Sequence, residues 1–228
     1  ATGYKETARH VPQRARVECL GVPVRREFFE APSAEEARRL LGLAPDVPVV
    51  AVLGGSLGAV RLNAVAQHLL PAVERGMFQL VWQYGHRWSP PEQLPAGVLA
   101  RPFFENPALV LAAAECVVAR AGGMTIAELC AVGRAAILVP YPGATEQHQV
   151  ANAQWMERNG AAVCVPDERA EGEVPGLVER LLADVERRQQ MAAAARQHAH
   201  PDAAQRLACL LWEARQGLLR AGVEGRGD

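Results

Sequence analysis

The chain has 228 residues, of which 50% are hydrophobic and 21% charged, as expected for a soluble globular protein with one sizeable core. Its 24 basic and 25 acidic side chains leave a formal net charge of −1, so no broad basic field could hold a nucleic-acid backbone, and nucleic acid is not a predicted partner. The five cysteines lack CxxC spacing, so the sequence indicates no metal site and favours a cytoplasmic protein. No run approaches the roughly 20 apolar residues needed to cross a bilayer, so any membrane contact is expected to be peripheral.

The first predicted elements alternate between strand and helix. Residues 1–25 contain no helix start and no complete strand-helix unit, so we expect them to be a remnant or linker entering from the middle of a longer protein. The apolar, β-branched run at 47–53 predicts a strand buried on both faces. Apolar residues at helical spacing over 59–73 predict a helix, and 78–82 predicts a second strand.

The same alternation repeats down the chain. Further strands are expected near 98 and at 116–119, 136–139 and 161–165, with helices at 107–114, 122–133 and 147–159. This order predicts an α/β fold, a doubly wound, Rossmann-like parallel sheet with helices on both faces. Ligands of such sheets bind at the carboxyl ends of the strands.

The carboxy-terminal part of the sequence is helical and charged. We expect helices at 174–182, 185–198 and 203–220 to pack on and cap the domain, and a frayed tail at 222–228. The predicted organisation is therefore a linker at 1–25, an α/β domain at 26–200, and a carboxy-terminal helix and tail at 201–228.

Two glycine-rich turns each join a predicted strand to a predicted helix. Gly54-Gly55-Ser56-Leu57-Gly58 lets a ligand approach the backbone closely, but it is neither a P-loop nor a GxGxxG fingerprint, and a tight turn without a ligand is an equally good interpretation. In the second turn, Gly122 and Gly123 would offer N–H groups to a diphosphate, aided by the helix dipole. Glu128, about one helical turn later, could accept two hydrogen bonds from a ribose, or could be an ordinary exposed glutamate near a helix start.

Polar and aromatic residues follow other strands on the same expected edge. His148, Gln149 and Asn152 gather at the start of a predicted helix, where amide and imidazole groups suit the hydroxyls of a sugar. A lone histidine there is more often a surface or capping residue. One ring of the pair Phe103-Phe104 could cover a flat base, although core packing is the commoner role of such a pair.

Taken together, these segments resemble the MurG-type UDP-N-acetylglucosamine transferases of peptidoglycan synthesis, two-domain enzymes of the GT-B class. The resemblance covers roughly residues 21–165 and depends on five motifs in order. They are Gly21-Val22-Pro23-Val24-Arg25 for the family's GNPVR, Gly54 to Ala59 with Leu62-Asn63 for GGSQGA...LN, Trp82-Gln83-Tyr84-Gly85 more loosely for HQ[ST]G, Arg120 to Glu128 for R[SA]GA[LM]TxxE, and His148-Gln149 with Asn152-Ala153 for HQxxNA. Val22 and Tyr84 depart from the family's pattern.

The resemblance implies a role for each matched position. Phe104 would lie by the uracil and Glu128 would hold the ribose, while His148 and Gln149 would face the N-acetylglucosamine. Ser56 and Arg25 would line the cleft, with Arg25 placed to meet phosphate or ribose. The residues implied to meet the diphosphate are Gly122, Gly123, Met124 and Thr125. The implied donor is UDP-N-acetylglucosamine, so the resemblance makes the domain at 26–200 a nucleotide-sugar-binding domain, and neither a cofactor nor a metal is implied.

The family's other half begins with a GGTGGH segment, whose histidine is a candidate general base, and binds a lipid-linked muramoyl-peptide acceptor. Nothing in this sequence matches that segment, so we expect the acceptor half to be a missing amino-terminal domain or a partner chain. The intact enzyme is expected to be peripheral on the inner face of the cell membrane.

Other functions remain open from the sequence. A related transferase could use another nucleotide sugar or a lipid acceptor such as diacylglycerol. From a different class, the chain could be a non-catalytic nucleotide-sugar-binding module or an epimerase-like protein. The HQ and NA pairs favour the N-acetylglucosamine transferase, and an epimerase should supply its own carboxylate acid-base set.

Overall fold

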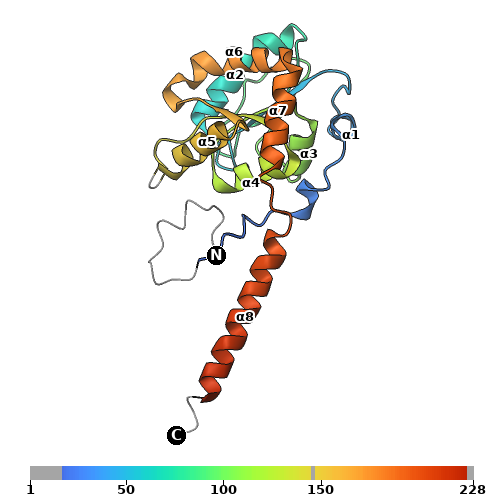
Figure 1. Cartoon of the computed structure of the whole chain (residues 1–228). Coiled ribbons are helices and arrows are strands. Elements are labelled where there is room, and N and C mark those ends of the chain that lie inside the picture. The colour runs from blue at the N-terminus through green and yellow to red at the C-terminus, as the bar shows by residue number, and fades with distance from the viewer. Residues whose placement is uncertain (1–16, 145–146, 225–228) are drawn as a thin grey trace.

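The structure, a computed structural model, describes residues 17–144 and 147–224 (Figure 1). Its centre is a six-stranded sheet in which every pairing is parallel. The strands are β1 (Val49–Leu53), β2 (Gln79–Gln83), β3 (Val98–Arg101), β4 (Cys116–Ala119), β5 (Ala135–Leu138) and β6 (Ala162–Cys164). Their order is β3-β2-β1-β4-β5-β6, so the direction of winding reverses between β1 and β4. The predicted doubly wound parallel sheet is confirmed.

Helices cover both faces of the sheet. One face carries α2 (Val60–Glu74) and α6 (Ala170–Ala183), which pack against each other; the other carries α3 (Pro107–Ala113), α4 (Gly123–Val132) and α5 (His148–Arg158). The helix α7 (Val185–Arg196) packs along α4 and β5.

The strands divide their side chains between two hydrophobic clusters, one on each face. Along β1, Val49 and Ala51 join the cluster under α3, α4 and α5, whereas Val50 and Val52 join the cluster under α2 and α6. Because both faces are buried, the strand is apolar throughout, which is why the sequence shows a continuous run instead of alternation.

Two short elements precede the sheet that the sequence patterns did not predict. A 3-10 turn, η2 (Arg26–Phe28), places Phe28 in the core. The helix α1 (Ala34–Leu40) is capped by Ser33, whose hydroxyl accepts a hydrogen bond from the Glu36 N–H. A serine followed three residues later by glutamate is a capping signal. Apolar periodicity does not predict this helix, because its seven residues are too few to show a periodic apolar face.

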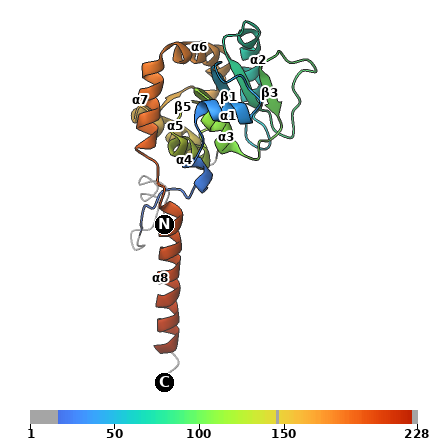
Figure 2. The same cartoon turned by 90° about the vertical axis from the view of Figure 1, so that its right-hand side faces the viewer.

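The last helix differs from expectation. The helix α8 (Ala203–Glu224) extends away from the domain instead of packing on it (Figures 1 and 2). Of its side chains described as far as residue 216, only Ala203 is buried. The prediction that all three carboxy-terminal helices pack on the domain is therefore wrong for α8. Most of the predicted linker, residues 1–16, and the tail at 225–228 lie outside the described residues.

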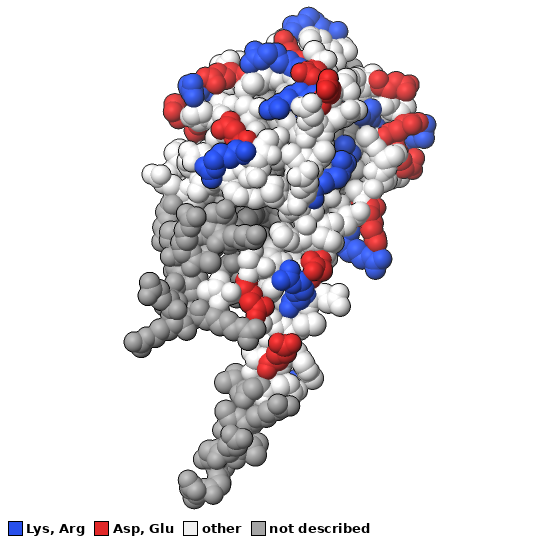
Figure 3. All heavy atoms as spheres, in the orientation of Figure 1, with Lys and Arg blue, Asp and Glu red and all other residues white. Residues whose placement is uncertain are grey.

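Basic and acidic side chains are mixed on the face of the molecule that Figure 3 shows. On the face shown in Figure 3, basic and acidic side chains alternate, with no extended field of one sign. Over the described residues, no helix is long and apolar enough to cross a membrane.

Candidate functional site

The two glycine-rich turns lie next to each other at the point where the sheet reverses its winding. One leaves the carboxyl end of β1 and the other leaves the carboxyl end of β4, and these strands are hydrogen-bonded neighbours. The crevice outside such a reversal point is where doubly wound sheets bind their ligands. Two turns separated by about 65 residues of sequence thus follow neighbouring strands at one edge of the sheet, which the alternation of elements alone does not establish.

The first turn is held by close backbone packing. Gly58 has φ +85°, and a Cβ atom there would lie 2.3 Å from the Tyr84 carbonyl oxygen. Gly85, in the turn after β2, packs against Gly58 in the same way, and the His86 N–H donates to the Ser56 carbonyl at 3.0 Å. Glycine is required here by the fold itself, while the Ser56 side chain stays exposed.

Asn63 fixes the first turn to the following helix. Its side chain is buried, accepts a 3.0 Å hydrogen bond from the Trp82 ring N–H and donates one of 3.0 Å to the Tyr84 carbonyl. The Leu62-Asn63 motif therefore contributes a structural brace between α2 and the end of β2.

The second turn shows no comparable internal demand for glycine. Gly122 is the N-cap of α4 with an ordinary φ of −64°, and a Cβ atom there would come no closer than 3.7 Å to the Thr125 hydroxyl. As the N-cap residue, Gly122 has no side chain with which to cap the helix start. Gly123 is the first residue of the helix, Met124 is exposed and Thr125 is half-buried. Glycine at position 122 is not required by the backbone conformation or by contacts with neighbouring residues, and its small size at a helix start fits close approach by an anion.

Glu128 lies farther along α4 beside Arg25. Partial burial raises the pKa of Glu128 to about 7, the nearby Arg25 guanidinium lowers it, and Glu27 raises it. Arg25 is mostly exposed and forms a 2.9 Å ion pair with Glu27. The first and fourth motifs, about 100 residues apart in sequence, thus meet at the start of η2 and the middle of α4. Glu27 was not predicted to belong to the site.

The start of α5 is tied to both neighbouring loops. The Gln149 side-chain oxygen accepts a 3.0 Å hydrogen bond from the Tyr141 N–H, and the Asn152 amide donates one of 3.0 Å to the Ala121 carbonyl. His148 is the exposed first residue of the helix. Gln147 before it has φ +54°, a left-handed conformation that is rare outside glycine and is found more often at functional sites.

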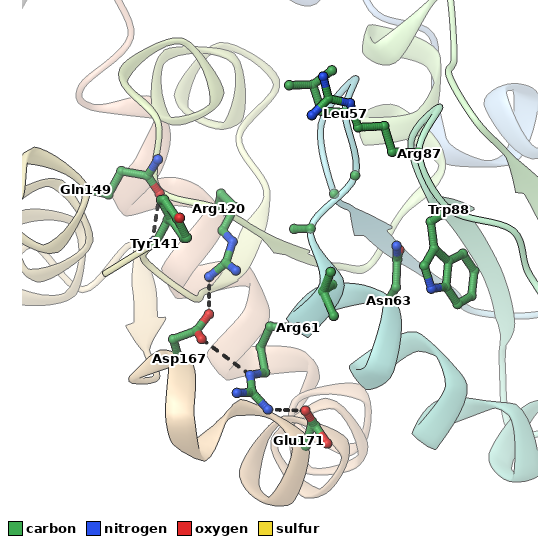
Figure 4. Close-up of a pocket in the computed structure, with 14 residues that line it drawn as sticks. Leu57, Arg61, Asn63, Arg87, Trp88, Arg120, Tyr141, Gln149, Asp167 and Glu171 are labelled. Atoms are coloured by element: carbon green, nitrogen blue, oxygen red, sulfur yellow. Dashed lines mark hydrogen bonds and ion pairs between the residues drawn. The ribbon is translucent and has the colours of Figure 1, made fainter. Parts of the chain in front are cut away.

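An open cleft of about 700 Å³ lies on the α2 and α6 side of the same edge (Figure 4). Gly54 and Gly58 line it from the first turn, Arg120 from the end of β4, Tyr141 from the loop after β5 and Gln149 from the start of α5. Of the site residues that the resemblance implies, Gln149 lines this cleft directly. Ser56, Arg25 and the α4 residues lie outside its lining.

A chain of ion pairs forms one wall of the cleft. Asp167, just after β6, pairs with Arg120 and, at 3.3 Å, with Arg61, which also pairs with Glu171 on α6 (Figure 4). Arg120 further donates to the Val139 carbonyl at 3.0 Å and lies 5.4 Å from the centre of the Tyr141 ring. The sequence patterns did not predict Arg61 or Asp167 as site residues. Arg61 lies in the first turn of α2 and Asp167 follows β6, so both are at the carboxyl edge of the sheet.

The aromatic pair divides between core and surface. The Phe104 side chain is 4% exposed and belongs to the core, while Phe103 is 44% exposed and stacks against His86 with 6.4 Å between ring centres. The Phe104 N–H donates to the Gln83 side-chain oxygen at 3.3 Å. Of the two rings, only that of Phe103 is open to a flat ligand in this structure.

Among the described residues, no group of three or more histidine, cysteine, aspartate or glutamate side chains could hold a metal ion. The groups that the structure gathers at this edge are backbone N–H groups, arginines, amides and the carboxylates of Glu128, Asp167 and Glu171.

Comparison with known proteins identifies the family. The model of the glycosyltransferase family 28 C-terminal domain matches residues 49–207, which is more than half of the chain. The chain belongs to glycosyltransferase family 28. The matched residues include both glycine-rich turns, the whole sheet and α2 through α7.

Relatives within family 28 carry a common name. The chain is 38% identical over 98% of its length to a UDP-N-acetylglucosamine–N-acetylmuramyl-(pentapeptide) pyrophosphoryl-undecaprenol N-acetylglucosamine transferase of Rubrobacter xylanophilus, and it covers 64% of that protein. It is 42% identical over 92% of its length to the transferase of the same name from Sorangium cellulosum, covering 52% of it. The chain thus spans between half and two thirds of these relatives.

Solved structures agree with the fold. The crystal structure of Acinetobacter baumannii MurG matches 89% of this chain with a TM-score of 0.65 and 28% identity, and the match covers 58% of that protein. The glycosyltransferase VinC, solved with dTDP, matches 78% of the chain and 44% of its own with a TM-score of 0.59 at 19% identity, which supports the fold alone.

Proposed function

We propose that this chain is the donor-binding half of an inverting transferase that moves N-acetylglucosamine from UDP-N-acetylglucosamine to a lipid-linked muramoyl-peptide acceptor in peptidoglycan synthesis. The observation that carries the proposal is the start of α4 at the reversal point of the sheet, where Gly122 has no internal reason to be glycine and Glu128 lies about a turn beyond. The names of the relatives in family 28 support the choice of donor and acceptor.

In this proposal the diphosphate binds at the start of α4. The N–H groups of Gly122 to Thr125 and the helix dipole would hold its negative charge, and Ser56 would line the crevice opposite. Arg25 and Glu128 come together on the α4 side, so Glu128 would accept hydrogen bonds from the ribose while Arg25 would approach phosphate or ribose.

The uracil and the sugar would extend in opposite directions from the diphosphate. The uracil would lie by the loop of Phe104, meeting its backbone edge or the Phe103 ring, because the Phe104 ring itself is buried. The N-acetylglucosamine would face His148 and Gln149 at the start of α5, where individual donors and acceptors can match its hydroxyls.

The proposed reaction needs only the groups that the family's two halves supply. The acceptor 4-hydroxyl oxygen would form a bond to the anomeric carbon as the bond from that carbon to the UDP oxygen breaks, which inverts the configuration. The hydroxyl proton would pass to a base in the acceptor-binding half, and the N–H groups of α4 would stabilise the negative charge on the departing UDP. We propose that this takes place at the cytoplasmic face of the cell membrane, with the transferase bound peripherally.

A calorimetric titration with UDP-N-acetylglucosamine, UDP-glucose and GDP-mannose tests the donor assignment. We expect the first ligand to bind most tightly, the second more weakly, and the guanine nucleotide sugar not to bind measurably. Equal binding of all three, or of none, would contradict the proposal. A non-catalytic binding module would show the same titration, so the proposal further expects transfer only when an acceptor-binding half is supplied.

A further inference from the structure

A second cleft lies at the opposite edge of the sheet, where β4 and β5 begin. It has a volume of about 300 Å³ and is lined by three arginines, Arg134, Arg188 and Arg196, together with Glu115. Arg134 directly precedes β5, and the other two project from α7, the helix that packs along α4 and β5 in Figures 1 and 2. The donor site proposed above lies at the carboxyl ends of the strands, so the two sites are separated by the length of the sheet.

Each of the three arginine side chains caps the carboxyl end of a different helix, and this brings them together. Arg134 donates to the carbonyls of Leu111 and Ala112 at 2.9 and 2.6 Å, at the carboxyl end of α3. Arg188 donates to two carbonyls at the end of α6, and Arg196 donates to one at the end of α4 at 3.4 Å. Cations at helix carboxyl ends satisfy unpaired carbonyls and oppose the dipole.

Helix capping does not use up these arginines. A guanidinium has five N–H donors, so the three side chains carry fifteen, and the bonds to described residues account for five of them. None of the three forms an ion pair with a carboxylate in the described part of the chain. The other donors of these cleft-lining side chains make no hydrogen bond to the described residues.

Glu115, the one carboxylate lining the cleft, is already engaged. One of its oxygens pairs with Arg38, and the other accepts a 2.6 Å hydrogen bond from the Val49 N–H. With Arg38 included, four positive charges face one negative charge. Three helix ends of about half a charge each, near −1.5 in total, still leave an excess of positive charge. The crowding is visible at Arg134, whose pKa is lowered by burial and by the nearby Arg196.

We propose that this cleft is an anion-binding site for a phosphate group, independent of the donor site. Guanidinium groups match phosphate oxygens with paired, charge-assisted hydrogen bonds, and a phosphate would relieve the repulsion among the arginines. The phosphate comes either from a free phosphate or diphosphate or from the headgroup of an anionic lipid. This inference does not depend on the proposed transferase activity.

The test begins by saturating the isotope-labelled chain with UDP, which occupies the proposed donor site. Inorganic phosphate or diphosphate is then titrated in, and binding is followed through the amide NMR signals. We expect the amide signals of Ala135 and Ala192, in the cleft, to shift with a saturable response, while those of Met124 report separately on the donor site. Failure of the donor proposal would appear only at Met124, and failure of the present one only at the cleft.

Variants on α7 provide the comparison. Arg188→Gln and Arg196→Gln should each weaken phosphate binding at the cleft by about tenfold, the scale of one charge-assisted hydrogen bond. Arg187→Gln is the matched control, because Arg187 lies on the same helix, is exposed and does not line the cleft. Arg196 is also exposed, so its replacement should leave folding intact even if Arg188→Gln loosens the end of α6.

Co-sedimentation with vesicles of phosphatidylglycerol and phosphatidylcholine distinguishes the two sources. Loss of vesicle binding in both cleft variants, but not in Arg187→Gln, would assign the site to lipid headgroups. Saturable cleft shifts with unchanged vesicle binding would assign it to free phosphate. Cleft signals that do not move, together with vesicle binding equal among all variants, would overturn the proposal.

Discussion

The side-chain amide of Asn152 donates a 3.0 Å hydrogen bond to the carbonyl of Ala121, which joins the start of α5 to the turn that opens α4. This bond therefore links the two loops proposed to hold the sugar and the diphosphate. The HQxxNA motif thus includes a residue that supports the neighbouring motif, in addition to residues that would face the sugar.

Asn152→Ala should weaken binding of both UDP and UDP-N-acetylglucosamine by a similar factor. Losing one net hydrogen bond costs about 1 kcal/mol, and the Ala121 carbonyl would lose its partner. Calorimetry and thermal unfolding measure the two effects. Asn159→Ala is the matched control, since the Asn159 amide donates at 2.8 Å to the Trp155 carbonyl at the far end of the same helix. A loss confined to the nucleotide sugar would contradict the supporting role.

Glu128 should make donor binding depend on pH. Its pKa of about 7 means that much of the side chain is protonated in the ligand-free protein at neutral pH. A ribose whose hydroxyls donate to the carboxylate favours the ionised form, so affinity for UDP-N-acetylglucosamine should rise as pH rises through about 7. One pH unit below that value, the affinity should be about tenfold lower than at a pH where Glu128 is fully ionised. The nucleotide sugar is the suitable ligand, because a terminal phosphate monoester itself titrates near pH ~6.

Replacement of Glu128 separates binding from stability. Glu128→Ala should weaken UDP binding by about 1–3 kcal/mol, and Glu128→Gln should flatten the pH profile. The raised pKa gives the folded state a stabilising contribution that is present below the ordinary glutamate range and lost as pH rises through about 7, so neither variant should unfold the domain at neutral pH. An unchanged dissociation constant would return Glu128 to the role of an ordinary surface residue.

Gln149 should distinguish the sugar from the nucleotide. Gln149→Ala is expected to lower affinity for UDP-N-acetylglucosamine by about 1–2 kcal/mol and leave UDP nearly unchanged. The structure adds a complication, because the Gln149 oxygen also holds the Tyr141 N–H. Gln149→Glu keeps that acceptor and removes the amide donors, so it should reproduce the loss if the donors contact the sugar. Equal weakening of both ligands would assign Gln149 to loop support.

Much of this arrangement could be predicted from the sequence. Continuous apolar runs such as 116–119 specify buried strands, and the alternation of elements specifies a parallel sheet, so the edge that carries the site follows directly. The strand order could not be predicted, because parallel connections of similar length allow several orders. The closeness of the first and second turns depends on that order.

Long-range ion pairs escaped prediction for a related reason. Arg61 and Asp167 are 106 residues apart and look like ordinary surface charges, since nothing local marks them. Phe104 could not be told from Phe103 by sequence, because which of two adjacent rings faces the core is decided by the backbone direction after β3. The amphipathic pattern of α8 likewise predicts a helix that packs on a partner surface, but it does not show whether that surface belongs to this domain, from which α8 extends away in Figure 1.

The two glycine-rich turns make opposite predictions for the same substitution. Gly58→Ala should destabilise the domain by about 2 kcal/mol or more, because a residue with a side chain is strained at φ +85° and its Cβ would collide with the Tyr84 carbonyl. Gly122→Ala should leave the melting temperature nearly unchanged, since φ is −64° and the nearest contact is an ordinary 3.7 Å.

Binding should show the reverse order. The added methyl group at Gly122 would occupy the space where a diphosphate approaches the start of α4, so Gly122→Ala should weaken UDP binding by about tenfold or more, equivalent to about one charge-assisted hydrogen bond. Thermal unfolding and calorimetry on both variants decide the matter. Gly42→Ala provides a control for strain alone, because Gly42 has φ +73° with nothing within 4 Å of an added Cβ and lies in the turn after α1. If Gly122→Ala binds UDP as tightly as the unaltered chain, the diphosphate does not approach this helix start, and the assignment of the second turn fails even though the fold and the family stand.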